Sequence, residues 1–231
     1  MRQILLTQEF YQRRIRRADH ALSHNLVAQH VGWSSTKVQR LGYTIASDLT
    51  SISWPQVKNV LDIGCGYGQL TEYLRTDKHY QGEYLGLDIM ARFITEAARS
   101  YPSPENQFIE SDFLTWQPTC TTKFGVIFCL GALSVNHDYP GLYGPISWQY
   151  AVDFITKICQ IATSAISLYF PNEQHVTVGQ TRVNSTMAFY RSGDLEQLFR
   201  NLLKDKIMSI ETQSYPQANA AETVMKVQLR D

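Results

Sequence analysis

The chain has 231 residues, which is long enough for one well-buried core and too short for two ordinary domains joined by a linker. Hydrophobic residues make up 44% of the chain and the mean hydropathy is −0.25, values typical of a globular protein rather than a disordered or membrane protein. Lysine and arginine balance aspartate and glutamate at 21 each, so no overall electrostatic field attracts a nucleic acid.

The cysteine pattern indicates neither a metal site nor a disulfide framework. Cys65, Cys120, Cys129 and Cys159 form no Cys-x-x-Cys pair, and no histidine cluster accompanies them. We therefore expect reduced thiols in a cytoplasmic protein. The apolar run at the N-terminus is too short for a signal peptide, and the longest apolar stretch, 124–133, has about half the length of a membrane span. No membrane partner is predicted.

Helical spacing dominates the N-terminal quarter of the chain. Residues 4–30 carry apolar side chains on one face, at Phe10, Ile15, Ala18 and Leu22. A second helix is expected after Ser34 or Ser35, because either hydroxyl can accept a hydrogen bond from the first turn. Its apolar face comprises Val38, Leu41, Ile45 and Leu49, and Pro55 is expected to end it. We therefore predict a helical cap over residues 1–55.

Strands and helices alternate through residues 56–231, which we expect to form the core of one compact domain with the cap. Strands are predicted at 57–63, 83–89, 107–110, 124–130, 165–170, 207–213 and 223–229. Helices are predicted at 70–74, 90–101, 147–162 and after Ser192, which is expected to cap the last one. This alternation predicts an α/β fold whose mostly parallel sheet has helices on both faces. Ligands of such sheets bind at the carboxyl ends of the strands.

A glycine-rich turn follows the first predicted strand, with the pattern Asp62-x-Gly64-x-Gly66-x-Gly68. Glycines allow a tight turn and a close approach of a ligand to the backbone. The pattern differs from the dinucleotide motif G-x-G-x-x-G, because Gln69 stands where the third glycine belongs. A carboxylate at Asp62 would repel a diphosphate and attract an ammonium group. The turn therefore favours a ligand with an amino-acid end.

Three further features lie in register with this turn. The second strand ends at Asp88, about twenty residues after the glycines, where a carboxylate can accept both ribose hydroxyls. The third is followed by Ser111-Asp112-Phe113, which presents a carboxylate and a ring to an adenine. The fourth ends in Leu130-Gly131, where small residues allow the chain to pass close to a sulfonium.

In this order the motifs resemble those of class I S-adenosylmethionine-dependent methyltransferases, over about residues 57–230. The resemblance implies a doubly wound, seven-stranded, Rossmann-like sheet with the last strand antiparallel, and S-adenosyl-L-methionine as the cofactor. It assigns Asp62, Gly64, Cys65, Gly66 and Gly68 to the methionine moiety, Asp88 to the ribose, Ile89 and Met90 to the adenine ring, Ser111, Asp112 and Phe113 to the adenine edge, and Leu130 and Gly131 to the methionine end. No metal is implied.

The acceptor is expected to be a small molecule bound by the cap and two long segments, 134–146 and 171–191, since loops of this length are usually functional. The candidate substrate-binding residues are Tyr11, Trp33, Ser134, Asn136, Tyr139, Tyr143 and Tyr190, and Val31 and Gly32 beside Trp33 are further candidates for cofactor or substrate contacts. Carboxylates among aromatic rings suit a small cation. We therefore prefer N-methylation of an amine- or guanidine-type metabolite, with Asp138 positioning the nitrogen and His137 or His175 accepting its proton.

Other functions stay open on the sequence alone. The closest alternative is an O-methyltransferase of a small hydroxylated or carboxylated metabolite. An RNA or protein methyltransferase would use the cluster Arg13-Arg14-x-Arg16-Arg17, which we interpret instead as a solvated helix face. The strand-four motif of nucleic-acid N-methyltransferases, Asn/Asp-Pro-Pro-aromatic, is replaced by residues 131–138. A non-catalytic cofactor-binding domain is a third possibility, and a monomer or a homodimer is equally compatible.

Overall fold

The computed structural model describes residues 2–20, 26–118, 122–138, 145–172, 187–217 and 220–230. Three helices precede the first strand: α1 (Arg2–His20), α2 (Leu26–His30) and α3 (Thr36–Ala46). Within the described ranges, no helix combines the length and the apolar character that crossing a membrane requires.

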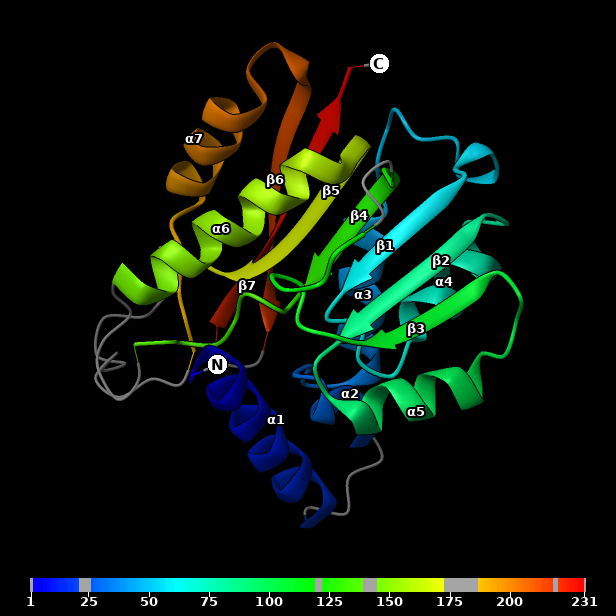
Figure 1. Cartoon of the computed structure of the whole chain (residues 1–231), viewed down its shortest axis with the longest axis vertical. Helices are drawn as coiled ribbons and strands as arrows, with labels where there is room; N and C mark the ends of the chain where they lie inside the picture. Colours follow the sequence, from blue (N-terminus) through cyan, green and yellow to red (C-terminus); the bar gives the residue numbers. More distant parts are fainter. Residues whose placement is uncertain are drawn as a thin grey trace.

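A seven-stranded sheet forms the centre of the molecule (Figure 1). Its strands are β1 (Asn59–Ile63), β2 (Glu83–Asp88), β3 (Asn106–Glu110), β4 (Phe124–Leu130), β5 (Ala162–Pro171), β6 (Ile207–Gln217) and β7 (Ala220–Leu229). They run in the order β3-β2-β1-β4-β5-β7-β6, and β7 is antiparallel to both of its neighbours. The predicted α/β fold with an antiparallel last strand is confirmed. The order reverses between β1 and β4, and such a switch point is where ligands of open α/β sheets bind.

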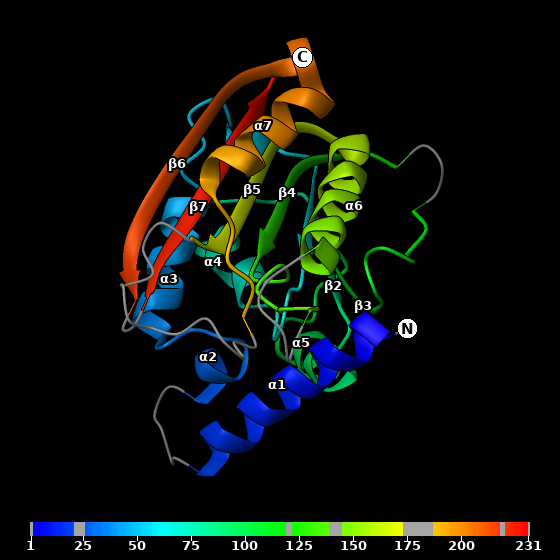
Figure 2. The same ribbon diagram turned by 90° about the vertical axis from the view of Figure 1, so that its left-hand side faces the viewer.

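Helices cover both faces of this sheet. The remaining ones are α4 (Gln69–Asp77), α5 (Ala91–Ser100), α6 (Pro145–Ile161) and α7 (Ser192–Leu203), with short 3-10 turns at Trp54–Gln56 and Lys204–Lys206. The helices α6 and α7 lie on one face, and α3 and α4 lie on the other (Figures 1 and 2). Strand β4 shows why two layers are needed, because its side chains alternate between the faces. Ile127 and Cys129 pack with α6 and α7, whereas Val126 and Phe128 pack with α3 and α4.

Several predicted helix boundaries differ from the structure, and the differences at α3 and α7 have a clear cause. Ser35 caps α3 as expected, with its hydroxyl accepting a hydrogen bond from the Val38 amide, but α3 ends at Ala46 rather than at Pro55. Leu49 lies in the loop after α3, but it is buried, so its apolar side chain continued the pattern of the buried helix face. The cap position of α7 is Arg191, and Ser192 is the first helical residue. The Ser192 hydroxyl instead accepts a hydrogen bond from the side-chain amide of Asn172.

Helix α1 lies across the carboxyl ends of the strands. The arrowheads of β1, β2 and β4 point towards it in Figure 1, and Figure 2 shows it crossing below the sheet. The apolar residues predicted to form its buried face include Phe10 and Ile15, and both are buried. This position places α1 directly over the edge where the sequence predicts the ligand.

Candidate active site

The turn between β1 and α4 brings backbone amides to the end of the sheet. The amides of Gly64 and Cys65 both donate to the carbonyl of Leu87, at 2.8 and 3.0 Å, which ties the turn to β2. Gly66 has a φ of +54°, and a Cβ atom there would lie 2.6 Å from Cγ1 of Val31. Because L-residues rarely adopt this conformation and Val31 leaves no room, only glycine fits. The cap and the turn therefore contact each other closely.

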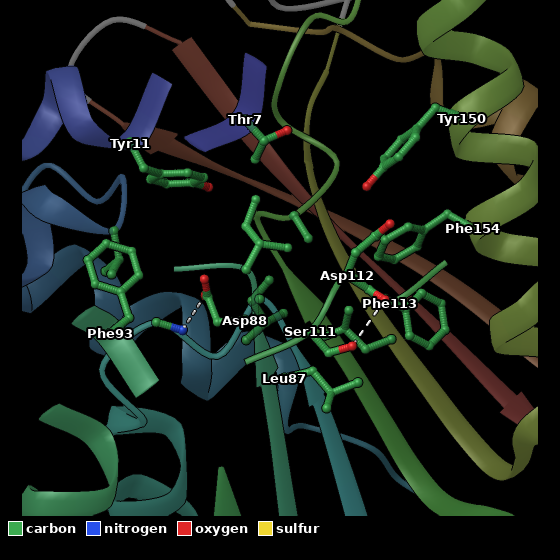
Figure 3. A pocket seen from close by; sticks show the side chains of 17 residues that line it. Thr7, Tyr11, Leu87, Asp88, Phe93, Ser111, Asp112, Phe113, Tyr150 and Phe154 are labelled. Carbon is green, nitrogen blue, oxygen red and sulfur yellow. Dashed lines mark hydrogen bonds between the residues drawn. The ribbon is translucent and has the colours of Figure 1, made fainter. Parts of the chain in front are cut away.

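The carboxylate of Asp88 organises the same turn from the end of β2. One oxygen accepts the amide of Gly66 (Figure 3) and the other accepts the amide of Met90, each at 2.9 Å. Burial raises the pKa of Asp88 to about 6, although these backbone hydrogen bonds act in the opposite direction. An ionised carboxylate held this way has further lone pairs for the hydroxyls of a ligand.

A cavity, here called the first cavity, opens above Asp88. Figure 3 shows Thr7 and Tyr11 of α1 on one side of it and Tyr150 and Phe154 of α6 on another. Eight of the residues predicted to bind the cofactor line it: Gly64, Gly66, Asp88, Ile89, Ser111, Asp112, Phe113 and Leu130. They come from the ends of β1, β2, β3 and β4, as expected for residues gathered at the switch point.

Four predicted cofactor residues do not line the first cavity. Asp62 is buried and accepts a hydrogen bond from the Tyr84 hydroxyl at 2.5 Å. Burial raises the pKa of Asp62 to about 7, and the Tyr84 bond lowers it. The others are Cys65 and Met90, which are both buried, and Gly68, where a Cβ would lie 2.8 Å from the Phe108 ring. Their predicted contacts with the cofactor stay predictions.

A second cavity adjoins the first, with which it shares Tyr11, Val31 and Leu130. Its other lining residues are Phe10, Arg14, Gly32, Trp33, Gly131, Ser134, Tyr169 and Met187. The predicted residues Trp33, Ser134 and Gly131 thus lie together here, beside Tyr11. Burial and the nearby Asp88 raise the pKa of Tyr11 to about 12. Tyr11 therefore keeps its proton near neutral pH.

Asp138 and Asn136 are engaged in the start of α6. The two carboxylate oxygens of Asp138 accept the amides of Ile146 and Ser147, at 3.1 and 2.8 Å. The side-chain oxygen of Asn136 accepts the Ser147 hydroxyl at 3.1 Å and the Asp138 amide at 3.0 Å. The Asp138 bonds satisfy amides that the first turn of α6 leaves unpaired. Neither residue lines either cavity, so their roles toward an acceptor stay predictions.

The other acceptor candidates divide into buried residues and residues that are not described. His137 is buried against the Tyr150 ring, with 4.2 Å between ring centroids, and burial lowers its pKa to about 4. Tyr190 is buried in the core, and its hydroxyl donates to the Leu133 carbonyl at 2.9 Å. Tyr139, Tyr143 and His175 lie outside the described residues.

Part of the lining of both cavities was not predicted from the sequence. The missed residues are Thr7, Phe10, Arg14, Ile63, Leu87, Phe93, Tyr150, Phe154, Tyr169 and Met187. A signal exists for α1, because Thr7, Tyr11 and Arg14 recur at intervals of four and three residues and so share one helix face. That face carries polar and aromatic residues where a core-facing helix would carry aliphatic ones.

Comparison with known proteins agrees with this geometry. Residues 60–143 match the family model described as a methyltransferase domain. This segment contains the glycine turn, Asp88, Asp112 and Gly131, the features on which the resemblance was based. Residues 60–143 thus carry a methyltransferase domain.

Curated relatives resemble part of this chain. Trans-aconitate 2-methyltransferase of Klebsiella pneumoniae (strain 342) is 32% identical over 109 residues, 47% of this chain and 41% of the relative. The corresponding enzyme of Acidovorax sp. (strain JS42) is 27% identical over 95 residues, 41% of this chain and 35% of the relative. The match thus spans less than half the length of these relatives.

Solved structures resemble the whole fold. Magnesium protoporphyrin IX methyltransferase from Synechocystis PCC 6803, crystallised with SAH, gives a TM-score of 0.61 at 17% identity, covering 84% of this chain and 83% of that one. A TehB-like methyltransferase from Corynebacterium glutamicum gives 0.51 at 16% identity, covering 96% and 97%. At these identities the likeness shows the fold alone.

S-adenosylmethionine is the cofactor of this family, and the first cavity has the chemistry to hold it. Asp88 suits the ribose hydroxyls, the Gly64–Gly66 backbone suits a methionine end, and Asp112 with Phe113 suits an adenine. The cavity volume is about 60 Å³, enough for only a few water molecules. Thr7 and Tyr11 lie above it, and we expect binding of the whole nucleoside to shift these α1 side chains outwards.

Proposed function

We propose that this chain transfers the methyl group of S-adenosylmethionine to a small molecule bound in the second cavity. The observation that carries the proposal is the junction of the two cavities at Tyr11, Val31 and Leu130, next to Gly131. The cofactor supplies an electrophilic methyl group on sulfur, and the protein mainly orients the acceptor towards it. Since α1 covers both cavities, an outward shift of this one helix would enlarge both.

The geometry gives more support to an O-methylated acceptor than to the amine that the sequence favoured. N-methylation was preferred because carboxylates were expected around the acceptor. Asp138 is instead bonded to α6, and none of the described residues that line the second cavity is acidic. Trans-aconitate, the acceptor in the names of the curated relatives, is a carboxylate.

A small acceptor is also more consistent with the surface than a nucleic acid. The net charge is zero, and within the arginine cluster only Arg14 turns towards a cavity, while Arg13, Arg16 and Arg17 are exposed. An RNA-binding cleft would need a continuous positive surface and would show a steep loss of affinity with salt.

The test is a methyl-transfer assay with S-adenosylmethionine labelled in its methyl group. A panel of small organic acids, alcohols and amines is offered, and labelled small-molecule product is expected with the wild type. The variant Asp88→Ala serves as the control, because it removes the ribose acceptor and should form no product. If the wild type binds the cofactor yet transfers no label to any panel member, the chain acts as a binding domain and the proposal is wrong.

A further inference from the structure

We propose that the second cavity recognises a carboxylate through Arg14, and that this carboxylate is the group that becomes methylated. The inference rests on the proposed function and specifies its acceptor. Arg14 is the only charged side chain among the described residues that line the cavity. It lies on α1, where its neighbours Arg13 and Arg16 are exposed to solvent.

Arg14 is held in place by two contacts. Its Nη2 atom donates to the carbonyl of Gly32 at 2.9 Å, and its guanidinium carbon lies 5.1 Å from the centroid of the Phe10 ring. The Gly32 contact uses one of the five N–H donors of a guanidinium group, whose planar fork matches a carboxylate. A fixed cation at this position repels an ammonium-bearing acceptor and attracts an anionic one.

Aromatic rings form much of the remaining wall and predict the body of the acceptor. Trp33 and Tyr169 pack with 4.9 Å between ring centroids, and Phe10 and Tyr11 approach from α1. Flat apolar surfaces of this kind suit a planar, unsaturated or aromatic skeleton. The predicted acceptor is therefore a small planar carboxylic acid, bound with its carboxylate towards Arg14 and the junction with the first cavity.

The chemistry of a carboxylate also matches the residues available. An amine or a hydroxyl must lose a proton in the reaction, whereas a carboxylate is already ionised near neutral pH. The described lining of the second cavity contains no histidine, aspartate, glutamate or lysine to accept a proton. In ester formation a carboxylate oxygen bonds to the methyl carbon while the bond between that carbon and sulfur breaks. The electron pair of the broken bond stays on sulfur. The sulfonium charge is neutralised, and no proton is released.

The test compares binding of acids and their amides to the protein saturated with S-adenosylhomocysteine. Benzoate, cinnamate and 3-phenylpropionate are each titrated against the corresponding neutral amide by calorimetry. At least one acid is expected to bind about tenfold or more tightly than its amide, and Arg14→Gln should remove this difference. Arg14→Lys keeps the charge and should restore part of it. Arg13→Gln, an exposed position on the same helix, is the matched control and should behave as the wild type.

Labelled product adds a second readout. A methyl ester releases its label as volatile methanol in alkali, whereas methylated amines and ethers do not. The inference is supported if the labelled product is labile in alkali and the KM for the acid is at least about tenfold higher in Arg14→Gln than in the wild type. The affinity of the variant for S-adenosylhomocysteine should be unchanged. The inference is overturned if no acid binds better than its amide, or if only amines are methylated. Failure to bind S-adenosylhomocysteine at all would instead contradict the proposed function.

Discussion

Replacing Asp88 by asparagine should weaken cofactor binding and remove its pH dependence. The wild-type carboxylate has two oxygens, each already holding one backbone amide at 2.9 Å, and its charge strengthens any hydrogen bond to a ribose hydroxyl. Asparagine keeps one acceptor and loses the charge. The loss of about one charge-assisted hydrogen bond, roughly 1.5–3 kcal/mol, corresponds to about 10- to 150-fold in affinity.

The pH profile provides the sharper part of this prediction. Because burial raises the pKa of Asp88 to about 6 and binding favours the ionised form, wild-type affinity should fall as pH decreases through this value. About tenfold is expected between pH 8 and pH 5, and Asp88→Asn should show a flat profile. Calorimetric titration with S-adenosylhomocysteine measures both. Asp77→Asn, at the end of α4 and outside both cavities, is the control. A wild-type profile that is retained in Asp88→Asn would refute the reasoning.

The stability of the free protein should change in the opposite direction over the same range. A carboxyl group whose pKa is raised above its ordinary value of 3.8 is stabilised in its protonated form. The contribution of Asp88 is thus fully present below that ordinary value and is lost as pH rises through about 6. Melting temperatures of the wild type and Asp88→Asn between pH 4 and pH 8 check the sign. The expected sign is contradicted if the wild type becomes more stable relative to Asp88→Asn as pH rises from 4 to 8.

Three other substitutions test the supporting structure. Gly66→Ala places a Cβ 2.6 Å from Cγ1 of Val31 and is strained at a φ of +54°, so thermal stability and affinity for S-adenosylhomocysteine should both fall; unchanged values would contradict the close contact. Asp138→Ala should cost about 1–2 kcal/mol in urea unfolding, since two α6 amides lose their acceptor, with calorimetric affinity for S-adenosylhomocysteine retained. Tyr190→Phe should cost about 1 kcal/mol in urea unfolding by removing the bond to Leu133, and a specific loss of methyl transfer would instead favour a role toward the acceptor.

The fold was predictable because its signals are local. Strand β4 is a continuous apolar run, and its observed bounds, Phe124–Leu130, are those predicted. The glycine turn and Asp88 are fixed by the ends of single strands, so the eight lining residues of the first cavity that come from strand ends followed from the order of strands and turns. Helix α3 shows the limit of this approach, because Leu49 continued the helical spacing although it is buried in a loop. Periodicity indicates which residues are buried, and not always in which element.

The acceptor region was less predictable because it depends on contacts between distant segments. Nothing near Asp138 in the sequence shows that its carboxylate bonds to the start of α6 eight and nine residues later. Tyr190 resembled a loop residue, yet its hydroxyl bonds to Leu133, 57 positions away. Arg14 was grouped with its arginine neighbours as a solvated face. What separates it from Arg13 is its pair of contacts with the Gly32 carbonyl and the Phe10 ring, of which the first comes from a segment 18 residues away.

The most direct test of the central claim is a crystal structure of the chain grown with S-adenosylhomocysteine. The account predicts the nucleoside in the first cavity, with its ribose hydroxyls on the Asp88 carboxylate, its adenine between Asp112 and Phe113, and the Tyr11 ring shifted outwards from its present position. The central claim is contradicted if the compound binds elsewhere. It is also contradicted if, at saturating concentration, no compound contacts Tyr11 or Asp88.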